Sequence, residues 1–417
     1  MIDLLLDEGS FSEVGRNSGF GTIDERPVCV YHFKGVFEGC SGEVVDLALK
    51  TGVPLIVVLD CEGMRVSFKA LSDLAGLVSK LSVASGVIPR ITVVSGRCHG
   101  SLCYTLGDFV VALKSCELSV VMPDTIKLVT GKDVNVKGDR HSGNVHFLVE
   151  SEEEASEVVK RLLSYLPLNN MEDPPIAETT DDPARQTEEI SGTIPEDPHK
   201  VYDVRNVIKT IVDDGDFMEI QPGYAENAVI GFGRLDGVTV GIVANNPMFY
   251  AGCIDLKAAE KISKFVRFCD AFNIPVLTLV DTPGFLPDVE QELSGLPKYA
   301  SKILQAYSEA TVPLVTVVLR KAYGPALVAM GSKFVGADIV YAYPNSEFAV
   351  IDLDTDAKML GIAKDEYLKE AGVERALDRG FIDSVIDPKW TRSKIINALR
   401  MLETKRKKLP PKKCSTW

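Results

Sequence analysis

The chain has 417 residues, of which 46% are hydrophobic, and it carries a formal net charge of −14 with a pI near 5.0. This length suits two domains of ordinary size, each with its own core. Such an acidic chain lacks the basic face that phosphate contacts require, so we expect no nucleic-acid partner.

Two apolar runs in the first half of the chain are predicted to be buried strands. Residues 53–58 lead to Asp60 and a turn that contains Gly63. Residues 88–94 lead to a second turn, at Gly100. Continuous apolar runs that alternate with helical segments are typical of parallel strands in βαβ units.

The segment between residues 169 and 200 has the composition of a linker. It is rich in Pro, Asp, Glu and Thr and poor in large apolar residues, as expected for a segment that does not form a core. We therefore predict an N-terminal domain over residues 1–168 and a C-terminal domain over residues 201–417. The linker over 169–200 is expected to be extended over the surface or mobile.

The second half contains the clearest local signals. Residues 228–243 are predicted to form a hairpin, because Asp236-Gly237 is a strong turn signal between two β-rich segments. Residues 256–268 carry apolar residues at helical spacing, and the apolar run 274–279 after them ends near Asp281. This order again predicts a βαβ unit.

The two halves repeat the same landmarks in the same order. The matched segments are 7–13 with 213–219, 19–21 with 231–233, 53–64 with 274–285, and 88–101 with 312–325. A repeat of this length indicates two tandem domains rather than a solenoid of short units. The sequence therefore predicts an α/β protein made of two similar domains.

Conventional catalytic side chains are scarce. The sequence has no Gly-x-Ser-x-Gly elbow, no phosphate-binding Gly-x-x-x-x-Gly-Lys and no His-Glu-x-x-His. Among the five histidines only His99 lies at a predicted turn of interest. Asp60 and Asp281 end strands, where a carboxylate either takes part in catalysis or, more commonly, accepts hydrogen bonds from turn amides.

Backbone amides are the remaining candidates, since each half has two glycine-containing turns whose N–H groups could converge on one carbonyl oxygen. The candidate donors are Gly63 or Met64 with Gly100 or Ser101 in the first half, and Gly284 or Phe285 with Gly324 or Ala326 in the second. Removing one such donor typically costs about 2.7–4 kcal/mol of barrier, and a paired-amide site suits enolate chemistry on a thioester. The alternative is that these glycines only permit tight turns.

The cysteines and the hydropathy of the sequence indicate which cellular compartment and which cofactors to expect. The nine cysteines include no Cys-x-x-Cys pair and no nearby histidine at zinc spacing, so we expect no metal. No apolar stretch reaches the roughly 18–20 residues that cross a bilayer, and the first residues lack a secretory signal pattern. We therefore expect a cytoplasmic protein without membrane insertion.

Motifs in both halves are specific enough to indicate a family. They include Val280-Asp281-Thr282-Pro283-Gly284-Phe285-Leu286-Pro287, Arg320-Lys321-Ala322-Tyr323-Gly324 and Ala84-Ser85-Gly86-Val87-Ile88-Pro89. These segments resemble the carboxyltransferase (beta) subunits of acyl-CoA carboxylases, with propionyl-CoA carboxylase beta chains and methylmalonyl-CoA decarboxylase subunits the nearest. The resemblance extends over nearly the whole chain.

The resemblance implies two tandem crotonase-like (ββα) domains and a carboxyltransferase that moves CO₂ from carboxybiotin, on a carrier protein, to an acyl-CoA of the acetyl or propionyl type. In that family, N-domain amides hold the acyl-CoA thioester and C-domain amides hold biotin, which implies biotin-binding roles for Gly284, Tyr323, Gly324 and Ala326. Biotin freed of its carboxyl group serves as the base.

The resemblance also implies partners. A biotin carboxyl carrier protein and a biotin carboxylase subunit are expected to act with this chain. The family forms its sites between the N-terminal domain of one subunit and the C-terminal domain of another, so a homo-oligomer, either a dimer or a trimer of dimers, is expected.

One departure from the family bears on this function. Where the family has Gly-Gly-Ala, this sequence has Gly324-Pro325-Ala326, and proline has no N–H to donate. A biotin-independent decarboxylase of a malonyl-type thioester is therefore an alternative, because it needs only one oxyanion site, with His99 as proton donor. A non-catalytic subunit of a carboxylase complex is a third. The sequence does not determine which acyl group is the substrate, or whether CoA or a carrier protein carries the thioester.

Overall fold

The computed structural model describes residues 1–15, 17–37, 42–64, 67–100, 106–138 and 140–410. The chain forms two compact units, Met1–Pro175 and Ile176–Trp417, here called the first and second units. The division falls inside the predicted linker, and the later part of that linker belongs to the core of the second unit, where Ile190 is fully buried. The domain boundaries at 168 and 201 stay a prediction.

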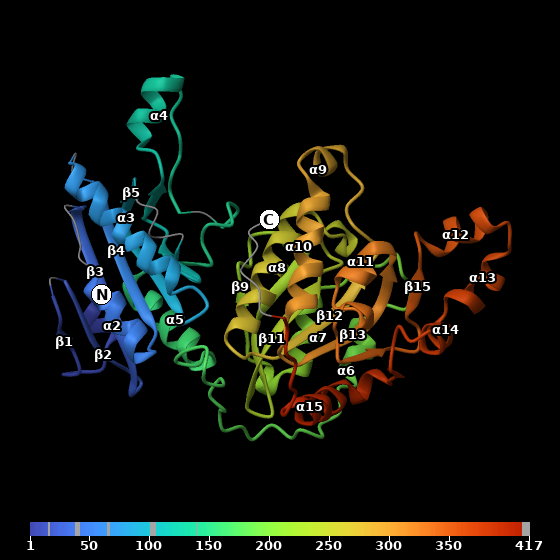
Figure 1. Cartoon of the computed structure of the whole chain (residues 1–417). Coiled ribbons are helices and arrows are strands. Elements are labelled where there is room, and N and C mark those ends of the chain that lie inside the picture. Colours follow the sequence, from blue (N-terminus) through green and yellow to red (C-terminus); the bar gives the residue numbers. More distant parts are fainter. Residues whose placement is uncertain (16, 38–41, 65–66, 101–105, 139, 411–417) are drawn as a thin grey trace. The chain divides into compact units, whose positions relative to one another are not determined.

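The first unit is built on one eight-stranded sheet with the order β1-β2-β3-β4-β5-β6-β8, in which β7 pairs with β5 (Figure 1). Strands β1 to β3 are antiparallel and the strands from β3 onward are parallel. The elements are α1 (Ile2–Leu5), β1 (Ser12–Glu13), β2 (Ser18–Ile23), β3 (Arg26–Phe37), α2 (Glu43–Thr51), β4 (Leu55–Met64), α3 (Phe68–Val83), β5 (Arg90–His99), β6 (Phe109–Leu113), β7 (Glu117–Ser119), α4 (Pro123–Thr130), β8 (Phe147–Val149) and α5 (Glu152–Tyr165).

The second unit has the sheet order β9-β10-β11-β12-β13-β14-β16, in which β15 pairs with β13. Its strands are β9 (Phe217–Ile220), β10 (Ala228–Leu235), β11 (Val238–Asn245), β12 (Val276–Thr282), β13 (Leu314–Tyr323), β14 (Ile339–Ala342), β15 (Glu347–Ala349) and β16 (Ser384–Val385). Its helices are α6 (Glu189–Thr193), α7 (Val204–Ile211), α8 (Leu256–Ala271), α9 (Val289–Leu293), α10 (Leu296–Glu309), α11 (Gly324–Ala329), α12 (Leu353–Leu360), α13 (Lys364–Ala371), α14 (Val373–Asp378) and α15 (Thr391–Leu402).

Strands β9 to β16 repeat β1 to β8 one for one, including the side pairing of β7 and β15. The prediction of an α/β protein with two similar domains is therefore confirmed. The repeat arises because each unit alternates apolar parallel strands with amphipathic helices in the same order.

An aspartate near the start of each unit fixes its first hairpin. Asp7 accepts hydrogen bonds from both turn amides of the β2–β3 hairpin, at 3.0 and 2.9 Å. Asp213 does the same for Asp236 and Gly237, at 3.0 and 2.8 Å. Asp236 and Gly237 have φ values of 57° and 78°, as a two-residue hairpin turn requires. The hairpin predicted from Asp236-Gly237 is confirmed.

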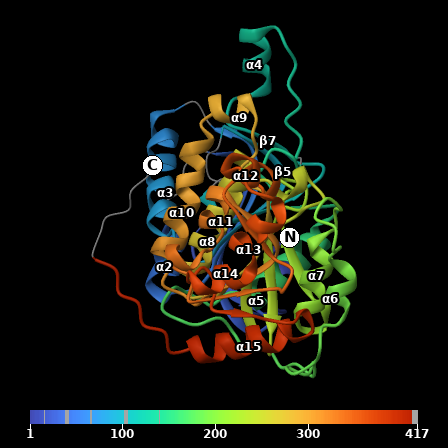
Figure 2. The ribbon, with the colours of Figure 1, turned by 90° about the vertical axis from the view of Figure 1, so that its right-hand side faces the viewer.

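Helices cover the sheets with apolar faces. Helix α3 begins after Ser67, whose Oγ accepts the N–H of Ala70 at 3.0 Å, and it buries Ala70, Leu77 and Leu81. In the second unit α8 and α10 pack side by side (Figures 1 and 2). Both helices bury residues at helical spacing, so helix burial follows the sequence periodicity.

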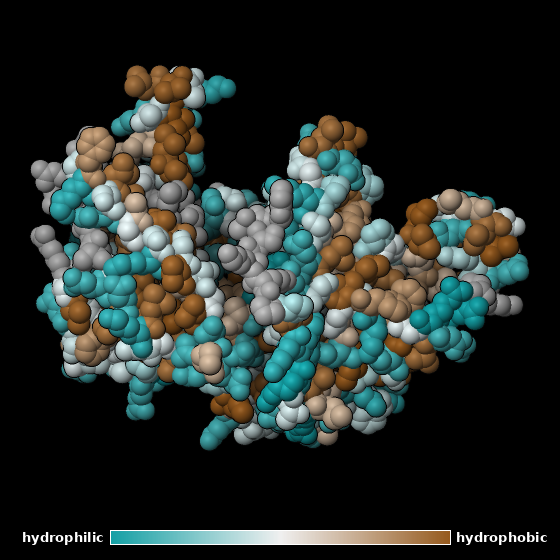
Figure 3. Space-filling view, viewed as in Figure 1, coloured by the Kyte–Doolittle hydropathy of each residue, from teal (hydrophilic) through white to brown (hydrophobic). Residues whose placement is uncertain are grey.

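Helix α4 does not pack into the hydrophobic core of its unit. It extends away from the sheet of its own unit (Figures 1 and 2) and buries none of its residues. Leu128 and Val129 on it are 85% and 78% exposed, and hydrophobic residues form much of the surface of this helix in Figure 3, beside polar ones. In the repeat α4 corresponds to α12, where Met359 and Leu360 are 74% and 63% exposed. Exposed apolar groups of this kind mark surfaces that contact other molecules.

Candidate active site

Each unit carries two of the predicted glycines near the ends of neighbouring strands, although Gly63 lies within β4 and Gly324 is the first residue of α11 rather than in a turn. Gly63 and Gly100 lie two residues beyond a directly paired position of the parallel strands β4 and β5. Gly284 and Gly324 lie two residues beyond a paired position of β12 and β13. Because neighbouring parallel strands end at the same edge of a sheet, the structure brings together the two predicted turns within each unit.

The four turn glycines have matching backbone conformations in the two units. Gly63 and Gly284 have φ values of 138° and 143°, and Gly100 and Gly324 have φ values of 67° and 56°. Residues with a Cβ rarely adopt such angles. At Gly284 and Gly100 an added Cβ would meet no atom within 4 Å. The conformation, and not a lack of space, therefore calls for glycine at these two positions.

Two of the predicted amide donors are already paired. The Gly100 N–H donates to the Ser119 carbonyl at 3.0 Å, and the Gly284 N–H donates to Thr282 Oγ1 at 3.2 Å. In the first unit the other two candidates, Gly63 and Met64, are the last residues of β4 and pair with Val36 and Phe37 of β3. Ser101, which was also predicted, lies outside the described residues.

In the second unit the remaining candidates are Gly324, Phe285 and Ala326, and the last two are placed as follows. Ile254 donates to the Gly284 carbonyl and accepts from the Leu286 N–H, at 3.0 and 2.9 Å, a pattern that directs the Phe285 N–H away from Ile254. Ala326 is the third residue of α11, and first-turn N–H groups have no intrahelical acceptor. These two amides are thus placed to receive an external acceptor.

The residue before Gly100 and the residue before Gly324 each form a hydrogen bond with a glutamate, on β7 in the first unit and on β15 in the second. His99 is buried, with Nδ1 at 2.7 Å from Ser119 Oγ and Nε2 at 3.1 Å from Glu117 Oε2. The Tyr323 hydroxyl donates to Glu347 Oε2 at the matching place in the second unit. As a proton donor to substrate, His99 would have to give up one of its two hydrogen bonds.

The structure places Asp60 within β4, four residues before its end, and Asp281 next to the last residue of β12, and each carboxylate binds the neighbouring strand. Asp60 Oδ1 accepts the Arg97 N–H at 3.2 Å, and Asp281 Oδ1 accepts the Lys321 N–H at 3.2 Å. The geometry supports the commoner of the two interpretations of these aspartates, in which the carboxylate fixes backbone.

Asp281 has two further partners that the sequence analysis missed. Its Oδ2 accepts from the Tyr202 hydroxyl at 2.9 Å and from Arg320 Nε at 3.1 Å, and burial raises the pKa of the Asp281 carboxyl while Arg320 opposes that shift. At Gly96, the residue that matches Arg320, a Cβ would lie 1.9 Å from Asp60 Oδ1. The only signal in the sequence for these partners of Asp281 is the charged pair Arg320-Lys321 at the end of an apolar run.

Within the described parts of the chain, no group of three or more His, Cys, Asp or Glu side chains is placed to hold a metal ion. Over the same residues, no helix has the length and apolarity of a membrane span.

Comparison with known proteins identifies the family. Residues 11–416 match the model of the carboxyl transferase domain. The carboxyltransferase subunit of propionyl-CoA carboxylase from Haloferax mediterranei is 40% identical and aligns with 99% of this chain and 91% of its own length. Methylmalonyl-CoA decarboxylase subunit alpha from Veillonella parvula is 42% identical, over 95% of this chain and 84% of its own length.

A solved structure agrees with these relatives. The crystal structure of transcarboxylase 12S, with hydrolysed methylmalonyl-CoA bound, superposes with a TM-score of 0.95 and 39% identity, and it covers 100% of this chain and 91% of that chain. The match confirms the tandem crotonase-like fold. The chain therefore belongs to the carboxyl transferase domain family and is a carboxyltransferase, an enzyme.

Proposed function

We propose that this chain is the carboxyltransferase subunit of a biotin-dependent acyl-CoA carboxylase. The observation that carries the proposal is the matching pair of turns, with φ values of 138° and 143° at one position and 67° and 56° at the other. Two equivalent half-sites suit a reaction in which two carbonyl-type oxygens gain charge, one on the thioester and one on biotin. Relatives named for acyl-CoA carboxylation support this assignment.

The first unit holds the thioester. As the α-proton leaves, charge builds on the carbonyl oxygen, and the amides of Gly63 or Met64 stabilise it. Each preorganised donor contributes about 2.7–4 kcal/mol to the lowering of the barrier. His99 and Glu117 position the turn at Gly100 through their hydrogen bond at 3.1 Å.

The second unit fits the ureido oxygen of biotin through the Phe285 and Ala326 amides. Pro325 removes the N–H that a glycine would supply at that position, and the amides of Phe285 and Ala326 remain as donors. Biotin, when bound, supplies the carboxyl group. Tyr323, anchored to Glu347, holds the turn at Gly324 against β15.

A biotin-independent decarboxylase of a malonyl-type thioester is the second candidate, and Pro325 is the observation that favours it. Loss of CO₂ from such a substrate generates an enolate that needs only one oxyanion site. The first unit by itself would then be sufficient for the reaction.

One assay separates the two candidates. The purified chain is incubated with malonyl-CoA and methylmalonyl-CoA without any biotin, and separately with propionyl-CoA, ATP, bicarbonate and a biotinylated carrier with its carboxylase. We expect carboxylation in the second mixture and no CO₂ release in the first. Pro325→Gly is expected to raise the biotin-dependent rate, because it restores a donor N–H. CO₂ release without biotin, with no effect of Pro325→Gly, would instead support the decarboxylase.

We also propose that the chain works as a homo-oligomer. The exposed apolar residues of α4 and α12 provide self-association surfaces, and the similar transcarboxylase 12S assembles as a hexamer. Light scattering at micromolar concentration is expected to give a mass of at least two chains, and the double substitution Leu128→Glu, Val129→Lys is expected to lower that mass. An active monomer would contradict this expectation.

A further inference from the structure

A buried carboxylate holds the loop that follows β15 in the second unit. Asp356 is the fourth residue of α12, and its Oδ2 accepts the Val350 N–H at 2.7 Å. The Ile351 N–H is shared between the two oxygens of Asp356, at 3.2 Å from each. The Tyr367 hydroxyl on α13 donates to Oδ2 at 2.7 Å. Three donors therefore fix this carboxylate, and the carboxylate fixes the backbone of the loop.

The loop that Asp356 holds lies against Gly324. Tyr323 at the end of β13 pairs in parallel with Ala349 of β15, so Val350 follows beside Gly324. A Cβ on Gly324 would lie 2.8 Å from the Val350 carbonyl oxygen, and Gly324 has a φ of 56°, which suits only a residue without a Cβ. The Val350 carbonyl thus leaves little room for Gly324 to move on this side.

The helices around Asp356 also pack on the residue before Gly324. Helices α12, α13 and α14 lie together beside β15 at one end of the second unit (Figure 1). Tyr323 is part of their small hydrophobic cluster, whose other buried members are Ala349, Leu353, Ala357, Tyr367 and Ala371. Ala326, one of the two donors proposed for biotin, is two residues beyond Gly324 on α11. A change at Asp356 therefore reaches this donor through Val350 and Gly324.

The first unit has no such carboxylate at the matching position. Helix α4 corresponds to α12 in the repeat, and its fourth residue is Ile126. An isoleucine side chain cannot accept a backbone N–H. The anchor is thus found in the unit that has Pro325 in its proposed site.

We propose that Asp356 is a positioning residue for the second unit, which holds the loop between β15 and α12 against Gly324 and so keeps the Ala326 N–H aimed at the ureido oxygen. The proposal rests on the proposed function of the second unit. Because Pro325 supplies no N–H, the remaining donors have to be held accurately. A displacement of about 1 Å can lower a rate by about a hundredfold.

The first test removes the carboxylate. Asp356→Ala is expected to lower kcat for biotin-dependent carboxylation of propionyl-CoA by about tenfold or more. The KM for propionyl-CoA is expected to stay within about twofold, because the first unit holds the thioester. Asp352→Ala is the matched control, since Asp352 caps the same helix by accepting the Thr355 N–H at 2.9 Å. It weakens α12 but leaves the bonds of Asp356 in place, so its kcat is expected to stay within about twofold.

A second background separates positioning from stability. Pro325→Gly restores an N–H beside Ala326, and the restored donor makes the rate less dependent on the aim of Ala326. In that background we expect Asp356→Ala to lower kcat by only about threefold or less, a non-additive result. A role of Asp356 limited to the stability of the fold would give equal losses in both backgrounds, and that outcome would overturn the proposal.

Tyr367→Phe guards against misfolding of the alanine variant, because it keeps the ring and removes only one donor to Asp356. We expect it to lower kcat by about threefold, and circular dichroism checks the folding of each variant. Unchanged kcat in folded Asp356→Ala would overturn the proposal, as would unchanged kcat in Tyr367→Phe where Asp356→Ala does not fold. An equal loss of kcat in Asp352→Ala would do the same. An unmodified protein that carboxylates no acyl-CoA would instead overturn the proposed function itself.

Discussion

Replacing Gly284 with alanine is expected to lower the rate of carboxyl transfer by about a hundredfold or more in a protein that stays folded. Gly284 has a φ of 143°, which an alanine rarely adopts, although the added Cβ would meet no atom within 4 Å. The substitution therefore acts through the backbone. It forces the turn to change and displaces the Phe285 N–H that follows it.

The measurement is the steady-state rate of propionyl-CoA carboxylation with saturating carrier protein. Gly295→Ala is the matched control, since Gly295 has a φ of 90°, also has room for a Cβ and lies at the start of α10. Its rate is expected to stay within about threefold of that of the unmodified enzyme, because it lies outside the proposed site. Gly63→Ala, with a φ of 138° at the matching place, extends the test to the first unit. Full activity of a folded Gly284→Ala variant would contradict the proposed role of the second turn.

Arg392→Ala is expected to destabilise the second unit by about 3–5 kcal/mol, as removal of one partner from a buried ion pair usually does. Arg392 on α15 is completely buried, and its guanidinium donates to Asp213 Oδ1 at 2.6 Å and to the Ile211 carbonyl at 2.8 Å. It thereby ties α15 to the end of α7. Without it, the Asp213 carboxylate stays buried with only its two backbone donors.

Unfolding in urea is followed by the fluorescence of Trp390, which lies two residues before Arg392. The chain has two tryptophans, so the background substitution Trp417→Phe makes the signal local to this unit. Arg185→Ala is the control, because the Arg185 side chain is 33% exposed and pairs with Asp181 at 2.7 Å, and partly exposed pairs contribute about 1 kcal/mol or less. Equal urea midpoints for the two variants would show that burial of Arg392 adds no stability.

The repeat, the fold class and the strand ends that carry the paired glycines could be predicted from the amino-acid sequence, although Gly63 lies in β4 and Gly324 in α11 rather than in turns. Asp236-Gly237, the aspartates after apolar runs and the glycines after them are local signals, because turn chemistry and strand periodicity act over a few residues. Because the same landmarks occur twice in the same order, the sequence predicts the same topology for both halves. The family resemblance rested on those segments as well.

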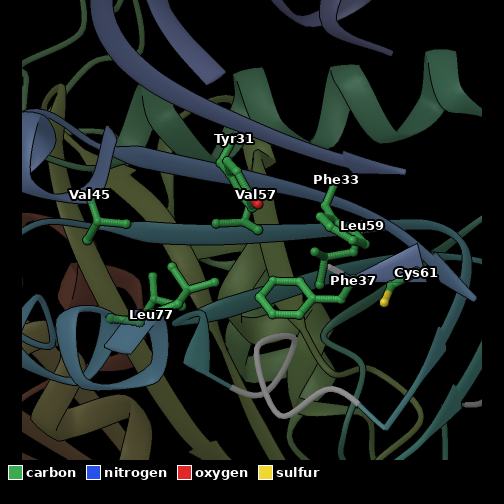
Figure 4. Close-up of a pocket in the computed structure, with 9 residues that line it drawn as sticks. Tyr31, Phe33, Phe37, Val45, Val57, Leu59, Cys61 and Leu77 are labelled. Carbon is green, nitrogen blue, oxygen red and sulfur yellow. The ribbon is translucent and has the colours of Figure 1, made fainter. Parts of the chain in front are cut away.

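Only the tertiary structure decided which amides and side chains are available for chemistry. The Gly100 N–H is taken by Ser119, both His99 ring nitrogens are engaged, and the Asp213 partner Arg392 lies 179 residues away in sequence. A small apolar cavity in the first unit is likewise lined by residues of four elements, β3, β4, α2 and α3 (Figure 4). A hydrogen-bond partner or an unfilled volume is set by how distant elements pack against each other, and local sequence periodicity carries no information about that packing.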